Sequence, residues 1–190
     1  NGDSYSKYAS LADFYNTKTY RGNPFFSQTN TYEIFKLGSE EIRKDQKFNE
    51  YRGKVDIIFT SPPYFNREAY SEDKNQSYKK YGSSYDSWVE GFLRPTLETC
   101  VEWLKDDRYL LWNIADLKVG NKFLPLEKDS VDILESYGMI YQYTLKMAME
   151  GMPGQNRMGE DGKPTCKNYC KVNGKYLKFE PVLVFKKEIR

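Results

Sequence analysis

Five consecutive residues, Thr60-Ser61-Pro62-Pro63-Tyr64, combine groups suited to holding a flat ligand that carries hydrogen-bond donors. Proline has a fixed φ and no backbone N–H, so the two prolines stiffen the turn. The carbonyls of Ser61 and Pro62 are therefore held in fixed directions and accept hydrogen bonds from an outside donor. Tyr64 adds an aromatic face beside them. A rigid turn without chemistry is the alternative interpretation of the same residues.

The elements around this run predict where it lies. Residues 54–60 form a short apolar run bounded by Gly53 and Pro62, which is typical of a buried parallel strand. Ligands of an open α/β sheet bind beyond the carboxyl ends of its strands. The run from Thr60 to Tyr64 therefore follows a strand at the edge where such a fold does its chemistry.

The rest of the chain alternates helices and strands. After that first strand we expect, in chain order, a helix at 83–104 that Pro95 kinks, a strand at 108–115, a helix at 124–137, a strand at 139–149 and a strand at 176–187. Pro181 implies an edge or a bulge in the last strand. This alternation predicts an α/β layered sheet with parallel crossovers.

Other segments are less regular. The pattern predicts helices at 3–15 and 40–51 and a short strand at 31–37. Residues 65–82 are expected to be a long loop, and residues 150–175 a long loop or a loose hairpin; loops of this length are usually functional or disordered. We expect one domain over residues 1–190.

Composition excludes several kinds of site. The chain has 190 residues, a net charge of +2 and no His, which removes His-based triads and most zinc sites. Cys100, Cys166 and Cys170 are odd in number and lack a C-x-x-C pair, so we interpret them as free thiols in a reducing cytoplasm. No apolar stretch approaches the roughly 20 residues of a membrane helix. We therefore expect a cytoplasmic protein with no metal and no membrane segment.

The segment Asp56-Ile57-Ile58-Phe59-Thr60-Ser61-Pro62-Pro63-Tyr64 resembles the catalytic motif of the DNA amino-methyltransferases, which methylate cytosine N4 or adenine N6. Ser before Pro-Pro-Tyr is typical of the cytosine-N4 type. Residues 109–116 and 176–187 resemble later strands of the same catalytic half, so the resemblance covers roughly residues 54 to 187. Residues 10–15 are similar to a helix of phage-type members, which favours a prophage or restriction-modification origin.

The resemblance implies a mechanism. The target base in double-stranded DNA leaves the stack, and Tyr64 stacks on it. Ser61 Oγ and the carbonyl of Ser61 or Pro62 accept hydrogen bonds from the base amine, whose lone pair then faces the methyl group of S-adenosylmethionine. Positioning and electrostatics, without a strong base, carry the rate.

The resemblance also implies a Rossmann-like, three-layer methyltransferase fold with a mostly parallel sheet. The family binds its cofactor with a glycine-rich loop, and no Gly-x-Gly occurs in this chain. We therefore expect a sheet that lacks its first strands, and feeble cofactor binding by this chain. Thr60 and the segment Gly38-Ser39-Glu40 are the candidates for cofactor contact, although Glu40 is more readily explained as a carboxylate at a helix start.

Two basic stretches are candidates for DNA contact. In the first loop, Lys74, Lys80 and the candidate residues Phe65, Arg67, Tyr70 and Lys79 mix cations with aromatic rings. In the second, Arg157 is followed by Lys163, Lys167 and Lys171. Solvated loops, and a core role for Phe65, remain open as alternatives. Asn113 or Asp116 is a candidate to border the base pocket, and Trp112 is expected in the core.

Two rival functions remain open. The same geometry serves protein-glutamine methyltransferases with Asn-Pro-Pro-Tyr, or RNA methyltransferases, although Ser61 and the basic loops speak against a protein substrate. The other rival is a catalytically incomplete chain that binds DNA, for which the missing glycine-rich loop is the main support.

Overall fold

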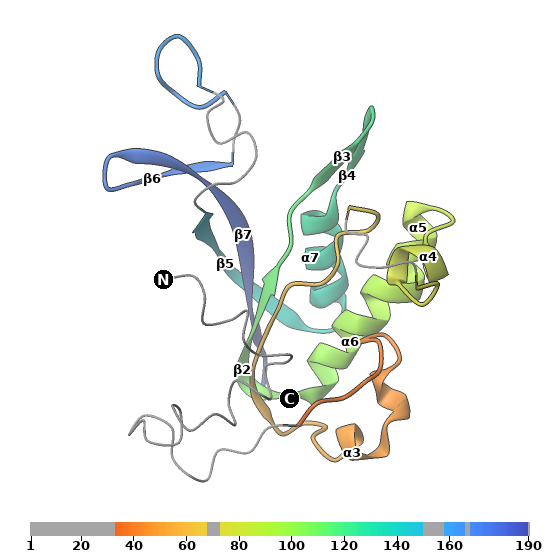
Figure 1. Cartoon of the computed structure of the whole chain (residues 1–190). Coiled ribbons are helices and arrows are strands. Elements are labelled where there is room, and N and C mark those ends of the chain that lie inside the picture. Colours follow the sequence, from red (N-terminus) through yellow and green to blue (C-terminus); the bar gives the residue numbers. More distant parts are fainter. Residues whose placement is uncertain (1–32, 68–72, 150–157, 166–167, 190) are drawn as a thin grey trace, which may run out of the picture. The chain divides into compact units, whose positions relative to one another are not determined.

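The computed structural model describes residues 33–67, 73–149, 158–165 and 168–189. The chain divides into two compact units, Asn1–Lys36 and Leu37–Arg190, and every element below belongs to the second. Its main sheet has the order β1-β2-β7-β5, with β6 pairing β7 (Figure 1). The strands are β1 (Val55–Thr60), β2 (Leu104–Asn113), β5 (Met139–Met149), β6 (Tyr169–Val172) and β7 (Lys175–Lys187).

This sheet is mixed, so the expectation of a mostly parallel sheet is wrong. Only β1 and β2 run parallel, whereas β7 lies between β2 and β5 and is antiparallel to both. The alternation of strands and helices along the sequence does not indicate the order of the strands in the sheet, so it could not predict that β7 lies between β2 and β5. Pro181 nevertheless lies at an edge, as expected, because the pairing of β7 with β2 ends at Val182, and Pro181 pairs only with Lys146 of β5 among the described strands.

Helices cover one face of the sheet and form the core with it. They are α5 (Tyr85–Trp88), the π-helical turn η2 (Val89–Leu93), α6 (Arg94–Trp103) and α7 (Leu126–Ser136). Pro95 lies in the first turn of α6, where its missing N–H is tolerated, and the helix type changes just before it. Trp88 and Trp112 are fully buried in this core, which confirms the expectation for Trp112. Trp112 Nε1 donates to Ser130 Oγ of α7 at 3.1 Å.

The opposite face of β1 is apolar but open. Ile58 packs against the core, while its neighbours Ile57 and Phe59 are each 61% exposed. Strands alternate their side chains between two faces, so a second layer is absent over these residues in the part of the chain described. No helix among the described residues is long and apolar enough to cross a membrane.

Several local predictions need correction. Residues 33–37 form no strand, and the rest of the predicted strand at 31–37 lies outside the described residues, as does the helix at 3–15. The helix expected at 40–51 is two short pieces, η1 (Ile42–Lys44) and α3 (Gln46–Asn49), because the Asp45 side chain accepts from Phe48 N and starts a new turn. The loop at 65–82 contains α4 (Ser77–Tyr81).

A hairpin within 117–124 was not predicted at all. β3 (Leu117–Val119) and β4 (Lys122–Leu124) pair antiparallel around Gly120, whose φ is +59°. The hairpin takes Leu124 from the predicted helix, so α7 begins at Leu126. Gly138, with φ of +83°, ends that helix region as expected.

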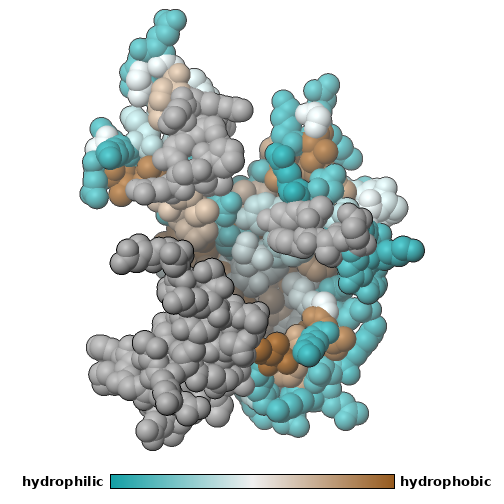
Figure 2. Space-filling model, viewed as in Figure 1, coloured by the Kyte–Doolittle hydropathy of each residue, from teal (hydrophilic) through white to brown (hydrophobic). Residues whose placement is uncertain are grey.

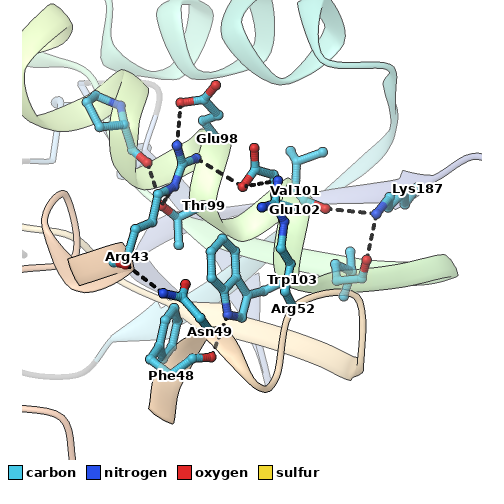
Figure 3. Close-up of polar contacts among 12 residues, drawn as sticks. Arg43, Phe48, Asn49, Arg52, Glu98, Thr99, Val101, Glu102, Trp103 and Lys187 are labelled. Atoms are coloured by element: carbon cyan, nitrogen blue, oxygen red, sulfur yellow. Dashed lines mark hydrogen bonds and ion pairs between the residues drawn. The ribbon is translucent and has the colours of Figure 1, made fainter. Parts of the chain in front are cut away.

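A polar cluster fixes η1 and α3 to α6 (Figure 3). Arg43 Nε donates to Thr99 Oγ1 at 2.9 Å, and Arg43 Nη1 lies 3.0 Å from Glu98 Oε2. The Trp103 ring stacks on Phe48 at 5.0 Å, and its Nε1 donates to the Phe48 carbonyl at 2.9 Å. The segment that precedes β1 is therefore tied to the helical layer.

Candidate active site

The turn after β1 mixes exposed and buried residues. Thr60, the last residue of β1, pairs with Trp112 of β2. Ser61 is exposed, Pro62 is buried and Pro63 is half-buried. Tyr64 is only 9% exposed and belongs to the core cluster. Ser61 is therefore open to solvent, while the tyrosine ring anchors the end of the turn.

Asn113, at the carboxyl end of β2, contacts the turn directly. The Tyr64 hydroxyl donates to Asn113 Oδ1 at 3.5 Å, and Asn113 Nδ2 donates to the Pro181 carbonyl at 3.0 Å. Asn113 is 2% exposed, so both of its polar atoms are used inside the protein. Of the two candidates at the end of β2, Asn113 is thus the one that meets the turn.

Asp116 has a structural role at the start of α7. Its Oδ1 accepts from Glu127 N at 2.9 Å, and Glu127 Oε1 accepts from Asp116 N at 3.2 Å. Burial raises the pKa of both carboxyls, and their backbone hydrogen bonds oppose that shift. The bond from Glu127 N satisfies an N–H group at the helix start, and the bond from Asp116 N ties the segment after β2 to that start.

Phe65 follows the turn in a strained conformation. Its φ is +46°, which non-glycine residues rarely adopt. The ring lies 5.7 Å from Tyr85 and 5.7 Å from Trp88, both in edge-to-face geometry. Phe65 therefore packs against α5, which favours its core role over a place in the base pocket.

The first candidate DNA-contact loop is only partly described. Arg67 and Lys79 are exposed, and the Lys79 ammonium lies 5.9 Å from the Tyr78 ring centroid. Lys80 instead pairs with Glu41 at 2.9 Å. Its side-chain hydrogen bond with Tyr81, and next the one with Glu41, raises the pKa of Lys80. Tyr70 and Arg157 lie outside the described residues.

The segment Gly38-Ser39-Glu40 lies against the helical layer. Ser39 Oγ and Thr96 Oγ1 of α6 are 2.9 Å apart. The Glu40 side chain is 6% exposed, 3.8 Å from Lys80 Nζ, and folds back so closely that a Cβ on Gly38 would lie 2.5 Å from its carboxylate. Gly38 therefore suits this fold-back, and the Glu40 carboxylate faces protein groups.

A cavity of about 320 Å³ lies on the helical side, away from the turn. Tyr85 and Asp129 line it, and the Tyr85 hydroxyl donates to Asp129 Oδ2 at 2.6 Å. The pKa of Tyr85 lies well above its ordinary value. Burial of the side chain is the larger cause, and the hydrogen bond to Asp129 is the second. Asp86, Glu90 and Asp132 make the lining acidic, and Arg94 pairs with Glu90 at 2.8 Å. Within the described residues, no group of three or more metal-ligating side chains occurs.

Two features near the site were not predicted from the sequence, the β3–β4 hairpin, which Gly120 marks, and a contact of the turn with β2. A loose hairpin was one of the two predictions for residues 150–175, and the β6–β7 hairpin turns at Asn173-Gly174, a dipeptide that is a strong hairpin signal when alternating residues flank it. The pairing of Tyr64 with Asn113 had no sequence signal, because 49 positions separate the two residues.

Comparison with known proteins agrees with this geometry. The family model described as DNA methylase, of the N6/N4 type, matches residues 55–188. The type II beta methyltransferase M.BslI of Bacillus sp. (strain NEB-606) is 27% identical over 175 residues, covering 87% of this chain and 17% of that protein.

Solved structures of TTHA0409 from Thermus thermophilus, a proposed DNA modification methylase, are also similar. The form complexed with S-adenosyl-L-methionine has a TM-score of 0.50 and 14% identity, covering 81% of this chain and 55% of that one. Another crystal structure of TTHA0409 has a TM-score of 0.49 and 14% identity, covering 81% and 53%. The first of these likenesses supports the α/β methylase fold. This chain spans about half of that structure and under a fifth of M.BslI. Because the family model covers well over half of the chain, the chain belongs to the N6/N4 DNA methylase family.

Proposed function

We propose that the protein transfers a methyl group from S-adenosylmethionine to an exocyclic amino group of a base in double-stranded DNA, with cytosine N4 preferred over adenine N6. The observation that carries the proposal is the Ser61–Tyr64 turn. It follows the carboxyl end of β1, where α/β folds bind ligands, in a chain of the N6/N4 DNA methylase family. Ser in the first position of the turn supports the preference for cytosine.

The turn acts by holding the amine. Ser61 is exposed. Its Oγ is the first acceptor, and the carbonyl of Ser61 or Pro62 is the second acceptor, for the two N–H groups. With both protons held, the nitrogen approaches tetrahedral geometry and its lone pair points away from the protein acceptors. Pre-organised acceptors of this kind lower a barrier without a strong base. The lack of His in the chain agrees with this chemistry.

The burial of Tyr64 limits how a base can stack on its ring. Its ring is 9% exposed and its hydroxyl bonds Asn113, so a base that stacks on it must displace part of its packing. We infer that the buried ring chiefly fixes the direction of the Ser61 and Pro62 carbonyls. A base contacts the ring after it enters the turn.

The described residues do not form a complete cofactor site. Glu40 faces Gly38 and Lys80 rather than an open pocket, and the chain has no Gly-x-Gly. The finer fold that we propose, a three-layer sandwich, needs further strands beside β1 and a second layer over Ile57 and Phe59, which are each 61% exposed. Calorimetry should then detect no micromolar affinity of this chain for S-adenosylmethionine.

The test of function is incorporation of labelled methyl groups into duplex DNA by the protein that carries these residues, followed by nucleoside analysis. We expect N4-methylcytosine, and a loss of about 100-fold in turnover for Ser61→Ala. Ser83→Ala, also exposed but distant from the turn in sequence, should keep full activity. If labelled methyl groups appeared in protein or RNA but not in DNA, this result would contradict the proposal and favour one of the rival substrates. Duplex binding without any methyl transfer, even in the complete protein, would favour the non-enzymatic alternative.

A further inference from the structure

A β-ribbon made of β6 and the start of β7 extends from the edge of the sheet that carries the Ser61–Tyr64 turn. β1 and β2 are parallel, so their carboxyl ends share one edge. β2 stops pairing with β7 at Asn113 and Val182, and residues 175–181 of β7 continue beyond that edge, where residues 178–181 still pair with β5 and residues 175–178 pair with β6. At about 3.3 Å per residue this extension reaches roughly 20 Å past the turn. Figure 1 shows this part of β7, with β6 beside it, standing away from the helices.

The ribbon is basic and aromatic. No Asp or Glu occurs between Asn168 and Phe179, whereas Lys171, Lys175 and Lys178 do. The strands are joined by Asn173 and Gly174, whose φ values of 48° and 82° fit a two-residue hairpin turn. Such a turn fixes the register, so the sequence dictates which side chains share a face.

One face of the ribbon gathers the tyrosines with two of the lysines. Tyr169 pairs with Lys178, and Lys171 pairs with Tyr176, which places these four side chains on the same side. The Lys171 ammonium lies 5.7 Å from the Tyr176 ring centroid. We call these four residues the tyrosine–lysine face. The opposite side carries Cys170, Val172 and Leu177, with Lys175 next to the turn.

A second basic hairpin leaves the same edge. β3 begins at Leu117, shortly after β2 ends, and the β3–β4 hairpin contains Lys118 and Lys122 but no acidic residue. Figure 1 shows the β3–β4 hairpin and the β6–β7 ribbon projecting from one end of the sheet, and Figure 2 shows hydrophilic residues on both. Two basic hairpins therefore leave the same end of the sheet as the Ser61–Tyr64 turn.

We propose that the tyrosine–lysine face binds the phosphate backbone of duplex DNA next to the base held by the Ser61–Tyr64 turn. Lysine ammonium groups and tyrosine hydroxyls are the donors that proteins direct at phosphate oxygens. A two-stranded ribbon also fits the width of a major groove. This proposal rests on the proposed function for its choice of ligand, but its test does not.

The test measures duplex binding without cofactor, by fluorescence anisotropy over a range of salt concentrations. The double variant Lys171→Gln, Lys178→Gln removes both charges of the face. We expect binding at least about tenfold weaker at low salt, and a salt slope lowered by about 2, since each phosphate contact contributes about 0.9. The double Arg variant at the same positions should restore binding.

The matched control removes two charges at the opposite edge. Lys54 precedes β1, and Lys105, near the start of β2, pairs with Asp56 at 2.8 Å. Lys54→Gln with Lys105→Gln should leave affinity and slope nearly unchanged. Circular dichroism and thermal melting of each variant show that it is folded.

Two results would overturn the proposal. One is a wild-type protein that does not bind duplex DNA, and the other is a folded Lys171/Lys178 variant with unchanged affinity and slope. Methyl transfer is scored separately. Ribbon-dependent binding without methylation contradicts the proposed function alone, and methylation that is indifferent to the ribbon contradicts this inference alone.

Discussion

The hydroxyl of Tyr64 donates to Oδ1 of Asn113 across 3.5 Å, in the buried region where β2 ends. Through this contact the turn after β1 is joined to β2. Because Asn113 also donates to the Pro181 carbonyl at 3.0 Å, the turn is joined to β7 as well. Three strands that are far apart in the sequence therefore fix the direction of one turn.

Removing the Asn113 side chain should weaken this junction more than removing the Tyr64 hydroxyl does. Asn113→Ala removes the donor to the buried Pro181 carbonyl and the acceptor from the Tyr64 hydroxyl, so we expect the free energy of unfolding to fall by about 1–3 kcal/mol. Tyr64→Phe removes one long hydrogen bond and should cost less. Urea denaturation of both variants and the double variant gives the coupling. Strictly additive losses would show that the two groups do not interact.

At position 65, glycine should be tolerated better than alanine. Both substitutions lose the ring contacts with Tyr85 and Trp88, but only Gly adopts a φ of +46° without strain. We expect Phe65→Gly to be more stable than Phe65→Ala by about 1 kcal/mol.

Leu97, in the middle of α6 and fully buried, supplies the control for that comparison. There the order should reverse, because Gly costs about 1 kcal/mol more than Ala inside a helix. Thermal or urea unfolding of the Gly and Ala variants at positions 65 and 97 measures both differences in stability. Finding Phe65→Ala the more stable of its pair would show that the positive φ is not a source of strain.

Cys100 should resist alkylation in the native protein. It is buried in α6, and burial raises the pKa of its thiol to about 12, so little reactive thiolate exists near neutral pH. Iodoacetamide labelling followed by peptide mass spectrometry should modify the half-buried Cys170 first, and Cys100 only on unfolding. Equal labelling rates at both positions would mean that α6 opens readily.

The two carboxyls at the start of α7, those of Asp116 and Glu127, should make the protein less stable as the pH rises through the range in which they ionise. Burial raises the pKa of Asp116 and Glu127 above their ordinary values, so the folded state binds these protons more tightly than the unfolded state. The contribution is favourable at low pH and is lost as pH rises through the raised pKa values.

Asp116→Asn tests this linkage, since its side-chain oxygen still accepts from Glu127 N but carries no charge. The free energy of unfolding of the variant, relative to that of the wild type, should be higher at about pH 7 than at about pH 4, because ordinary carboxyl groups titrate near 4. Urea denaturation at the two pH values measures the difference. A difference that is independent of pH would contradict the assignment.

Much of the local structure could be predicted from neighbouring residues. The bounds of β1 (Val55–Thr60) and β5 (Met139–Met149) agree closely with the apolar runs that predicted them, and Gly138 ends the α7 region as its φ of +83° requires. The predicted burial of β1 is wrong for Ile57 and Phe59, which are each 61% exposed. The predicted strand at 31–37 failed over residues 33–37, because apolar alternation alone does not provide a pairing partner.

The sequence by itself determined the stiff turn at Ser61–Tyr64, its place after a strand, and the family, because local chemistry and motif order depend only on nearby residues. Tertiary structure alone decided the antiparallel insertion of β7 between β2 and β5, the burial of Tyr64 against Asn113, and the common edge of the turn and the Lys171–Lys178 ribbon. Strand pairing and burial join residues far apart in the chain, and many pairings satisfy the same local preferences until the whole sheet is packed.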